Sequence, residues 1–317
     1  MGLNERKRSP FSFLRTPFVT NFFYSATAAS TAVLFTNPFD VAKTRLQLQG
    51  ELIEAGKGKR VYAGPIDCIV KTMRIEGVRG VQRGLTTAIA REAALNFFRI
   101  GMFAPVLKFY HPHEGPAPIY IKIAAGITTG STAALICNPL DIMKTRMQAQ
   151  ASGKNSAVGY QHSFSGVLNG FKRLLSQEGI LGLWKGVSPS VLRLALGSSG
   201  QLASYTEIKE HALAQGYKDG PMLHIGTSFV SVIFGVTAMN PVDVVRTRIY
   251  NQPAKKEMRL YKSAFDAAFK MLKYEGPQAF FKGWFAHYLR GAPHVALIFV
   301  FLEQLKKRKP IEKFFGD

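Results

Sequence analysis

The chain alternates between uncharged stretches and strongly polar ones. Three uncharged runs span residues 19–39, 123–140 and 222–242, and each contains a proline near its end. Each run is about long enough for a helix to cross a hydrocarbon layer of ~30 Å. A second, weaker apolar stretch follows each run, at 85–110, 187–211 and 284–305. The pattern therefore predicts six membrane-spanning helices.

The six spans form three copies of one unit of about 100 residues. The prolines Pro38, Pro139 and Pro241 are 101 and 102 residues apart. Each is followed by a Glu-Gly pair and then by a basic residue and a glycine, namely Arg83-Gly84, Lys185-Gly186 and Lys282-Gly283. We divide the chain into a basic N-terminal segment, 1–17, and three repeats, 18–117, 118–219 and 220–317.

An acidic and a basic residue follow each of the three prolines. A proline inside a helix removes a backbone hydrogen bond, so we expect the three helices to kink and their ends to bend toward a common axis. Just beyond it, an acid and a base lie three residues apart on one helical face. These pairs are Asp40 and Lys43, Asp141 and Lys144, and Asp243 and Arg246. Pairs within single helices would stabilise little, whereas three copies in register predict a ring of charges that closes the axis.

An arginine recurs inside the second span of each repeat. Arg91, Arg193 and Arg290 each follow the basic residue of the basic-glycine pair by eight positions. A rise of 1.5 Å per residue places all three roughly 12 Å into their helices. A single arginine could instead extend to the membrane interface, but three at one depth predict side chains that face one another in a cavity. We call them the site arginines.

The site arginines indicate the class of ligand. Guanidinium groups bind carboxylate or sulfate oxygens in bidentate fashion, so three of them favour a small anion with two negative charges. Leu194 and Gly291, each next to a site arginine, would leave room for a short carbon skeleton.

Two other ionisable residues lie close to this site. Glu92 follows Arg91 and should point about 100° away around the helix, so we expect it not to cancel the positive charge. His294 lies one turn after Arg290 and is expected to face the same cavity, where it would suit proton-coupled exchange. A structural role for His294 is an equal alternative.

The repeated motif Pro-x-Asp-x-x-Lys/Arg-x-Lys/Arg, with Glu-Gly and an aromatic-basic-glycine ending, resembles the mitochondrial carrier family. The first copy departs from it at Gln82, where an aromatic residue is usual. The resemblance covers all three repeats and implies an all-α, three-fold pseudosymmetric bundle of six transmembrane helices with three short matrix helices. It also implies a multi-pass transporter of the mitochondrial inner membrane that works by alternating access.

Local stretches resemble one group within that family. GSSGQLASY at 197–205, KDGPMLH at 218–224, RIYNQ at 248–252 and RGAPH at 290–294 are similar to the fungal oxaloacetate carriers. That group implies oxaloacetate, related dicarboxylates or sulfate as substrates. In that group glutamine is usual at the position of Arg91. An arginine there is similar to dicarboxylate, oxoglutarate and uncoupling-type carriers, which leaves a malate/oxoglutarate exchanger or an uncoupling-type anion or proton leak as alternatives. A membrane adaptor without transport would not need three site arginines.

The resemblance also assigns partners. The six ring residues become the matrix gate, with Asp40 paired to Lys144, Asp141 to Arg246 and Asp243 to Lys43. Gln47 and Gln148 would brace two of these pairs, and Tyr250 stands in the third bracing position. The cytosolic gate would contain Phe103, Tyr205, Lys209, Glu303 and Lys306, with only one acid, and should therefore be weak.

Bound cardiolipin is a further implication of the resemblance. The starts of the even-numbered spans, at Arg83-Gly84, Lys185-Gly186 and Lys282-Gly283, and of the short helices, near Gly64, His162 and Ser263, would offer free amides to its phosphates. The protein would function as a monomer.

Composition excludes several other functions. The formal net charge is +21, but the bases lie in loops, span ends and the cavity, which favours anionic lipid over nucleic acid. Two cysteines are too few for a disulfide framework, and no metal-ligand spacing is present. No nucleophile-base-acid set or nucleotide-binding glycine loop occurs, so we expect neither an enzyme nor a cofactor.

Overall fold

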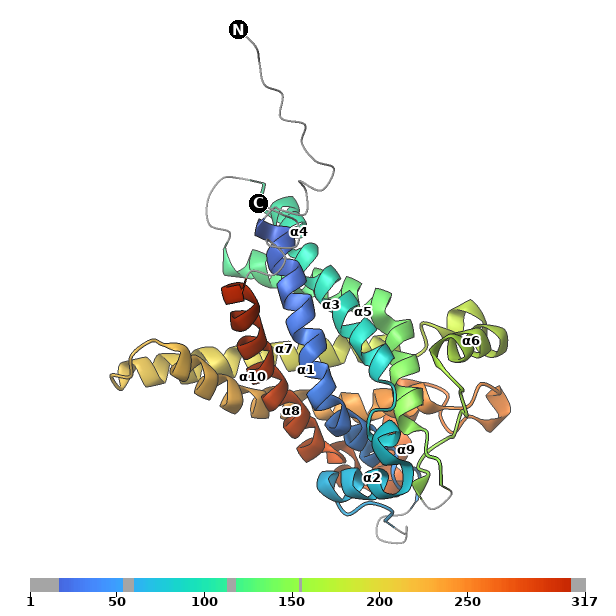
Figure 1. Ribbon diagram of the computed structural model, residues 1–317. Coiled ribbons are helices and arrows are strands. Elements are labelled where there is room, and N and C mark those ends of the chain that lie inside the picture. The colour runs from blue at the N-terminus through green and yellow to red at the C-terminus, as the bar shows by residue number, and fades with distance from the viewer. Residues whose placement is uncertain (1–16, 54–59, 113–117, 154–155, 309–317) are drawn as a thin grey trace.

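The computed structural model describes residues 17–53, 60–112, 118–153 and 156–308, and the regular elements in these ranges are all helices. This confirms the predicted all-α fold. The chain runs from α1, in blue in Figure 1, to α10, in red.

The first span of each repeat forms a long helix that continues through its proline. These helices are α1 (Pro17–Leu48), α5 (Ile119–Ala149) and α8 (Pro221–Asn251). Each extends by about ten residues beyond the proline, so the charged motif lies on the last turns of the same helix. The helix thereby fixes the acid and the base on one face.

The second spans form α3 (Leu85–Gly101), α4 (Phe103–Tyr110), α7 (Val187–Ala214) and α10 (Trp284–Arg308). The prediction of one continuous helix over 85–110 is wrong, because a turn at Met102 separates α3 from α4. Pro105 has no amide to donate to the carbonyl four residues earlier, which accounts for the break. The backbone bonds from Met102 to Phe98 and from Val106 to Met102 remain.

Short helices connect the spans on the side where the long helices end. They are α2 (Pro65–Val81), α6 (Val167–Gly182) and α9 (Ala264–Glu275), with the 3-10 turns η3 (Lys256–Met258) and η4 (Pro277–Phe281). Gly64 and Ser263 are N-caps, as predicted, but the predicted start near His162 is wrong because Gly166 caps α6. His162 instead stacks on Phe164 and contacts the carbonyl of Asn251.

The helices pack side by side in one bundle. α7 packs along α8, α1 along both α3 and α10, and α3 along α5 (Figure 1). Large apolar side chains on the outer faces are exposed, among them Phe35, Ile127 and Phe234. Such a surface fits lipid rather than water. Within the described residues, Met222–Asn251 and Pro277–Leu305 are long and apolar enough to cross a membrane.

Candidate functional site

The matrix-gate residues form the three predicted ion pairs between neighbouring long helices. Lys144 Nζ lies 2.8 Å from Asp40 Oδ2, Arg246 Nη2 lies 2.6 Å from Asp141 Oδ2, and Lys43 Nζ lies 2.7 Å from Asp243 Oδ2. The three aspartates are buried. The three long helices are therefore tied together at this end of the bundle.

The second oxygen of each gate aspartate contacts a site arginine. Arg91 Nε lies 3.0 Å from Asp141 Oδ1, Arg193 Nε lies 3.4 Å from Asp243 Oδ1, and Arg290 Nε lies 3.3 Å from Asp40 Oδ1. The even-numbered helices thus bring all three guanidinium groups to one level directly beside the gate. Each aspartate joins a gate base of a neighbouring long helix to a site arginine, and Asp243 also lies 3.7 Å from Arg246 Nη1 on its own helix.

Glycines at the starts of the even-numbered spans allow this close approach. Gly186 has φ +71°, a conformation that residues with a Cβ rarely adopt. A Cβ at this position would lie 2.8 Å from the ring of Tyr250. Gly84 and Gly283 have the same sign of φ and approach Gln148 and Gln47 in the same way. The close packing at these glycines therefore fixes where each even-numbered span begins relative to the neighbouring long helix. The site arginine follows eight residues after the basic residue of each pair.

The side chain of Glu92 does not lie where the sequence predicts. Its Oε1 lies 2.7 Å from Arg91 Nη1 and 3.0 Å from Arg290 Nη2, and only 6% of the residue is exposed. The expectation that it points away and leaves the positive charge untouched is therefore wrong. A glutamate side chain is long enough to turn back toward the axis, and attraction to two guanidinium groups in a buried site favours that rotamer.

The other residues predicted to line the cavity, His294, Leu194 and Gly291, differ in their surroundings. His294 is buried and its Nδ1 lies 3.2 Å from the hydroxyl of Thr36. Leu194 is half-buried. A Cβ at Gly291 would lie 3.2 Å from Val232 on α8, so the room predicted beside Gly291 is already filled.

The three bracing positions differ from one another. Gln47 Nε2 donates to Asp243 Oδ2 at 2.8 Å, as predicted. Gln148 instead accepts a hydrogen bond from Thr44 and donates one to Asn37. Tyr250 contacts the gate through its ring, which lies under the guanidinium of Arg246 at 4.6 Å. The third brace is thus a cation–π contact.

Sequence reasoning missed a second set of ion pairs behind the gate. Each last arginine of the repeated motif is buried and binds the glutamate of the Glu-Gly pair in its own repeat. The pairs are Arg45 with Glu76, Arg146 with Glu178 and Arg248 with Glu275. Three-fold recurrence of both partners in the sequence was the signal that could have identified them.

The basic residues predicted to bind lipid contact the same glutamates. Arg83 Nε lies 3.0 Å from Glu76, Lys185 Nζ lies 3.6 Å from Glu178, and Lys282 Nζ lies 2.6 Å from Glu275. Each therefore anchors the start of an even-numbered span to the preceding short helix. A glycine with positive φ follows each glutamate, at Gly77, Gly179 and Gly276.

The residues predicted for the cytosolic gate have partners close to them in sequence. Lys209 Nζ lies 3.1 Å from Asp219, the Tyr205 hydroxyl lies 2.6 Å from His224 Nδ1, and Glu303 pairs with Lys307 one turn later. Phe103 begins α4. The side chain of Lys306 lies outside the described residues. The ring of ion pairs at one end of the bundle is therefore accompanied by local pairs at these positions.

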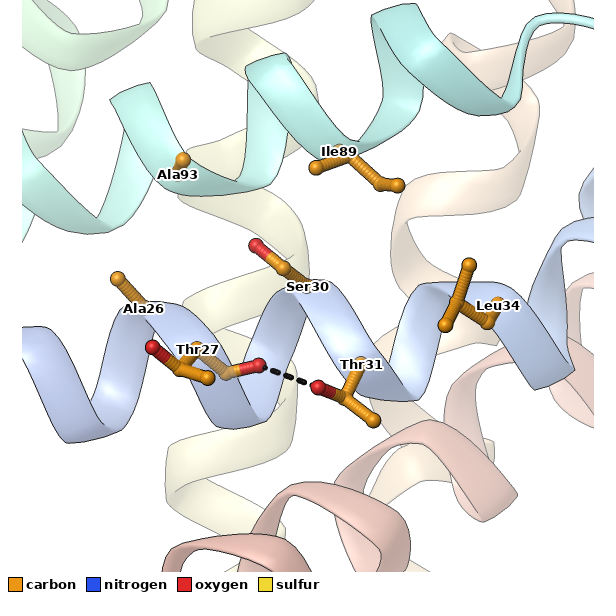
Figure 2. A pocket seen from close by; sticks show the side chains of 7 residues that line it. All are labelled: Ala26, Thr27, Ser30, Thr31, Leu34, Ile89 and Ala93. Atoms are coloured by element: carbon orange, nitrogen blue, oxygen red, sulfur yellow. Dashed lines mark hydrogen bonds between the residues drawn. The ribbon is translucent and has the colours of Figure 1, made fainter. Parts of the chain in front are cut away.

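Two cavities lie outside the arginine site. One, of about 380 Å³, is a groove between α1 and α3 lined by apolar side chains and by the hydroxyl-bearing side chains of Thr27, Ser30 and Thr31, shown in Figure 2. No charged residue lines it, so it does not suit an anion. The other, of about 240 Å³, lies between the start of α7 at Gly186 and the start of α9 at Ser263, and Lys185, Arg259 and Lys262 line it.

Comparison with known proteins decides the family. The family model for "Mitochondrial carrier protein" matches residues 15–114, 115–215 and 217–312. The chain belongs to the mitochondrial carrier family. It is therefore a three-repeat transport protein of the mitochondrial inner membrane.

Individual carriers are similar to it over most of their length. The mitochondrial oxaloacetate transport protein of Saccharomyces cerevisiae is 35% identical over 288 residues, which cover 88% of this chain and 86% of the relative. Mitochondrial uncoupling protein 1 of Arabidopsis thaliana is 35% identical, covering 89% and 91%. The mitochondrial 2-oxoglutarate/malate carrier protein of Caenorhabditis elegans is 33% identical, covering 91% and 92%.

Proposed function

We propose that this carrier moves small dianions, foremost oxaloacetate and related dicarboxylates or sulfate, by alternating access through the three site arginines. It acts as a transporter and not as an enzyme. The observation that carries the proposal is the sharing of each gate aspartate between a gate base and a site arginine. This arrangement links an anion-binding site directly to a gate.

The charges of this cluster favour a substrate with two negative charges. The cluster contains six cationic side chains, the three gate bases and three site arginines, against four carboxylates, Asp40, Asp141, Asp243 and Glu92. The excess is two positive charges. A bound dianion brings the cluster closer to neutrality in a buried environment where unpaired charge is costly.

Competition for the site arginines explains how binding opens the gate. A substrate anion that binds Arg91, Arg193 and Arg290 withdraws them from Asp141, Asp243 and Asp40. Each aspartate then loses one of its cationic partners, and the free energy that holds the matrix gate closed decreases. A ligand shifts a conformational equilibrium by its difference in affinity for the two states.

Exchange of malate and oxoglutarate, or an uncoupling-type leak, is the second candidate. It is favoured by the similarity to a 2-oxoglutarate/malate carrier and to an uncoupling protein at nearly the same identity as to the oxaloacetate carrier. A leak would dissipate a potential without counter-substrate, whereas an exchanger requires one.

Bound cardiolipin is the second part of the proposal. The cavity between Gly186 and Ser263 combines the amino ends of two helices with Lys185, Arg259 and Lys262. Helix amino ends and basic side chains together suit a phosphate group. Such a lipid would join two repeats of one chain, which is consistent with a functional monomer.

Transport by the purified protein in liposomes tests the proposal. Vesicles are loaded in turn with oxaloacetate, malate, oxoglutarate, sulfate or phosphate, and uptake of labelled substrate is measured. We expect rapid exchange of oxaloacetate and sulfate and slow exchange of phosphate. Exchange of malate and oxoglutarate alone would favour a malate/oxoglutarate exchanger. Dissipation of a potential without any exchange would favour an uncoupling-type leak.

A further inference from the structure

Glu92 breaks the three-fold symmetry of the site. The residue after the site arginine is Glu92 in the first repeat, Leu194 in the second and Gly291 in the third. The acid therefore serves no purpose common to the three repeats. A buried ionisable group inside a membrane span is costly and indicates a specific function.

Glu92 occupies the position that a substrate carboxylate would need. One oxygen, Oε1, lies within hydrogen-bond distance of both Arg91 and Arg290. Arg193, in contrast, contacts Asp243 at 3.4 Å and the sulfur of Met239 at 3.6 Å. A dianion that binds Arg91 and Arg290 must displace Glu92 from them.

The charges around Glu92 come from four helices. Arg91 lies on its own helix, α3, and the neighbouring helices contribute Asp40 on α1, Asp141 and Lys144 on α5, and Arg290 and His294 on α10. Arg91 and Arg290 are in contact with its carboxylate. The balance of charge at Glu92 therefore depends on whether those two guanidinium groups bind Glu92 or the substrate.

We propose that Glu92 competes with the substrate for Arg91 and Arg290 and carries one proton across the membrane with each dianion. This inference rests on the proposed dianion transport. When substrate takes Arg290, Glu92 loses a cationic partner while two negative charges arrive beside it. A carboxylate in that situation is stabilised in its neutral form.

The transport cycle balances in charge and in protons. A proton from the side of entry binds the carboxylate of Glu92 as the dianion binds the arginines. When the dianion leaves on the other side, Arg290 returns to Glu92 and the proton is released there. Only the O–H bond of Glu92 forms and breaks, and a net single negative charge crosses with the proton and dianion.

His294 is the competing proton acceptor. It lies one turn from Arg290, and its Nδ1 contacts Thr36. Within the described part of the chain, no ion pair joins His294 to a carboxylate, and a proton there would add a positive charge near Arg290 without direct neutralisation. We therefore assign the proton to Glu92 and include a His294 variant in the test.

Sulfate uptake into liposomes that contain a pH-sensitive dye tests the inference, because sulfate keeps both charges from about pH 6 to about pH 8. For the unmodified protein we expect about one proton to enter per sulfate and uptake to accelerate several-fold as external pH falls. Glu92→Gln should abolish proton entry and flatten the pH dependence. Glu92→Asp should retain both, as should Glu210→Gln, which changes an exposed acid on α7.

Specific outcomes overturn the inference. They are sulfate uptake without protons in the unmodified protein, an unchanged proton ratio in Glu92→Gln, and loss of proton entry in His294→Gln with retention in Glu92→Gln. Failure of the unmodified protein to transport any dianion would contradict the proposed function instead.

A binding measurement covers the case in which Glu92→Gln does not transport. Sulfate is titrated calorimetrically into the detergent-solubilised carrier in two buffers with different ionisation enthalpies, which reports the protons taken up on binding. We expect about one for the unmodified protein and for Glu92→Asp, and none for Glu92→Gln. Equal proton uptake by all three proteins would overturn the inference.

Discussion

Arg290 and Lys144 bind the two oxygens of one carboxylate, that of Asp40, at 3.3 Å and 2.8 Å. The first cation belongs to the proposed substrate site and the second to the matrix gate. The same relationship recurs in the other two repeats. In the proposed mechanism, binding and gating therefore depend on the same three aspartates.

Replacing any site arginine by alanine should severely reduce exchange. One charge-assisted contact contributes about 1.5–3 kcal/mol, which corresponds to a loss of roughly ten-fold to more than a hundred-fold in substrate affinity. The measurement is sulfate and oxaloacetate exchange by Arg91→Ala, Arg193→Ala and Arg290→Ala at matched amounts of folded protein. Near-normal exchange in two of the three would contradict a joint anion site.

Exchanging the charges of one gate pair should restore activity that each single change removes. Asp40→Lys and Lys144→Asp each place like charges together, whereas the double variant re-forms an ion pair with opposite direction. Arg290 also contacts Asp40, so we expect partial recovery. Exchange rates of the three variants measure it, and a double variant no better than either single one would refute the pairing.

Glu76→Gln should destabilise the protein by about 3–5 kcal/mol, because it leaves the buried Arg45 without its charged partner. Both side chains are fully buried, and Arg45 Nη1 lies 2.6 Å from Glu76 Oε1. Thermal unfolding in detergent measures the effect.

Asp67→Asn on the same short helix provides the control. Asp67 pairs with Lys71 at the surface, and an exposed pair contributes at most about 1 kcal/mol. Equal losses of stability in the two variants would show that the buried pair has no special role.

Stability should fall as pH rises through neutrality because of Glu51, in the loop after α1. Burial raises the pKa of its carboxyl group to about 7, although Arg248 nearby opposes the shift. The folded state therefore holds more protons than the unfolded state between the ordinary glutamate pKa and about 7, so the free energy of unfolding decreases as pH rises across that window.

Glu51→Gln removes this contribution. We expect its melting temperature to exceed that of the unmodified protein at pH 8 and to vary less between pH 5 and pH 8. Each unit of pKa shift corresponds to about 1.4 kcal/mol. Parallel melting curves for the two proteins across this range would show that Glu51 ionises freely in the folded state.

The sequence by itself determined the apolar spans, the repeats and the residues of the charged ring. Helical geometry fixes which residues share a face and a depth. The common level of the site arginines followed from that geometry and does not depend on the detailed rotamer of any side chain. Spacing alone leaves each gate aspartate two neighbouring bases to choose from, and the pairing of Asp40 with Lys144 came from the resemblance to the family.

Only the tertiary structure decided the contacts of individual side chains between helices. Glu92 turns toward Arg290 on a distant helix, and Val232 fills the space beside Gly291. Helical spacing gives the direction in which a residue leaves its own helix. It does not give the neighbour across the gap, because long side chains rotate toward the strongest opposite charge and small ones allow another helix to approach.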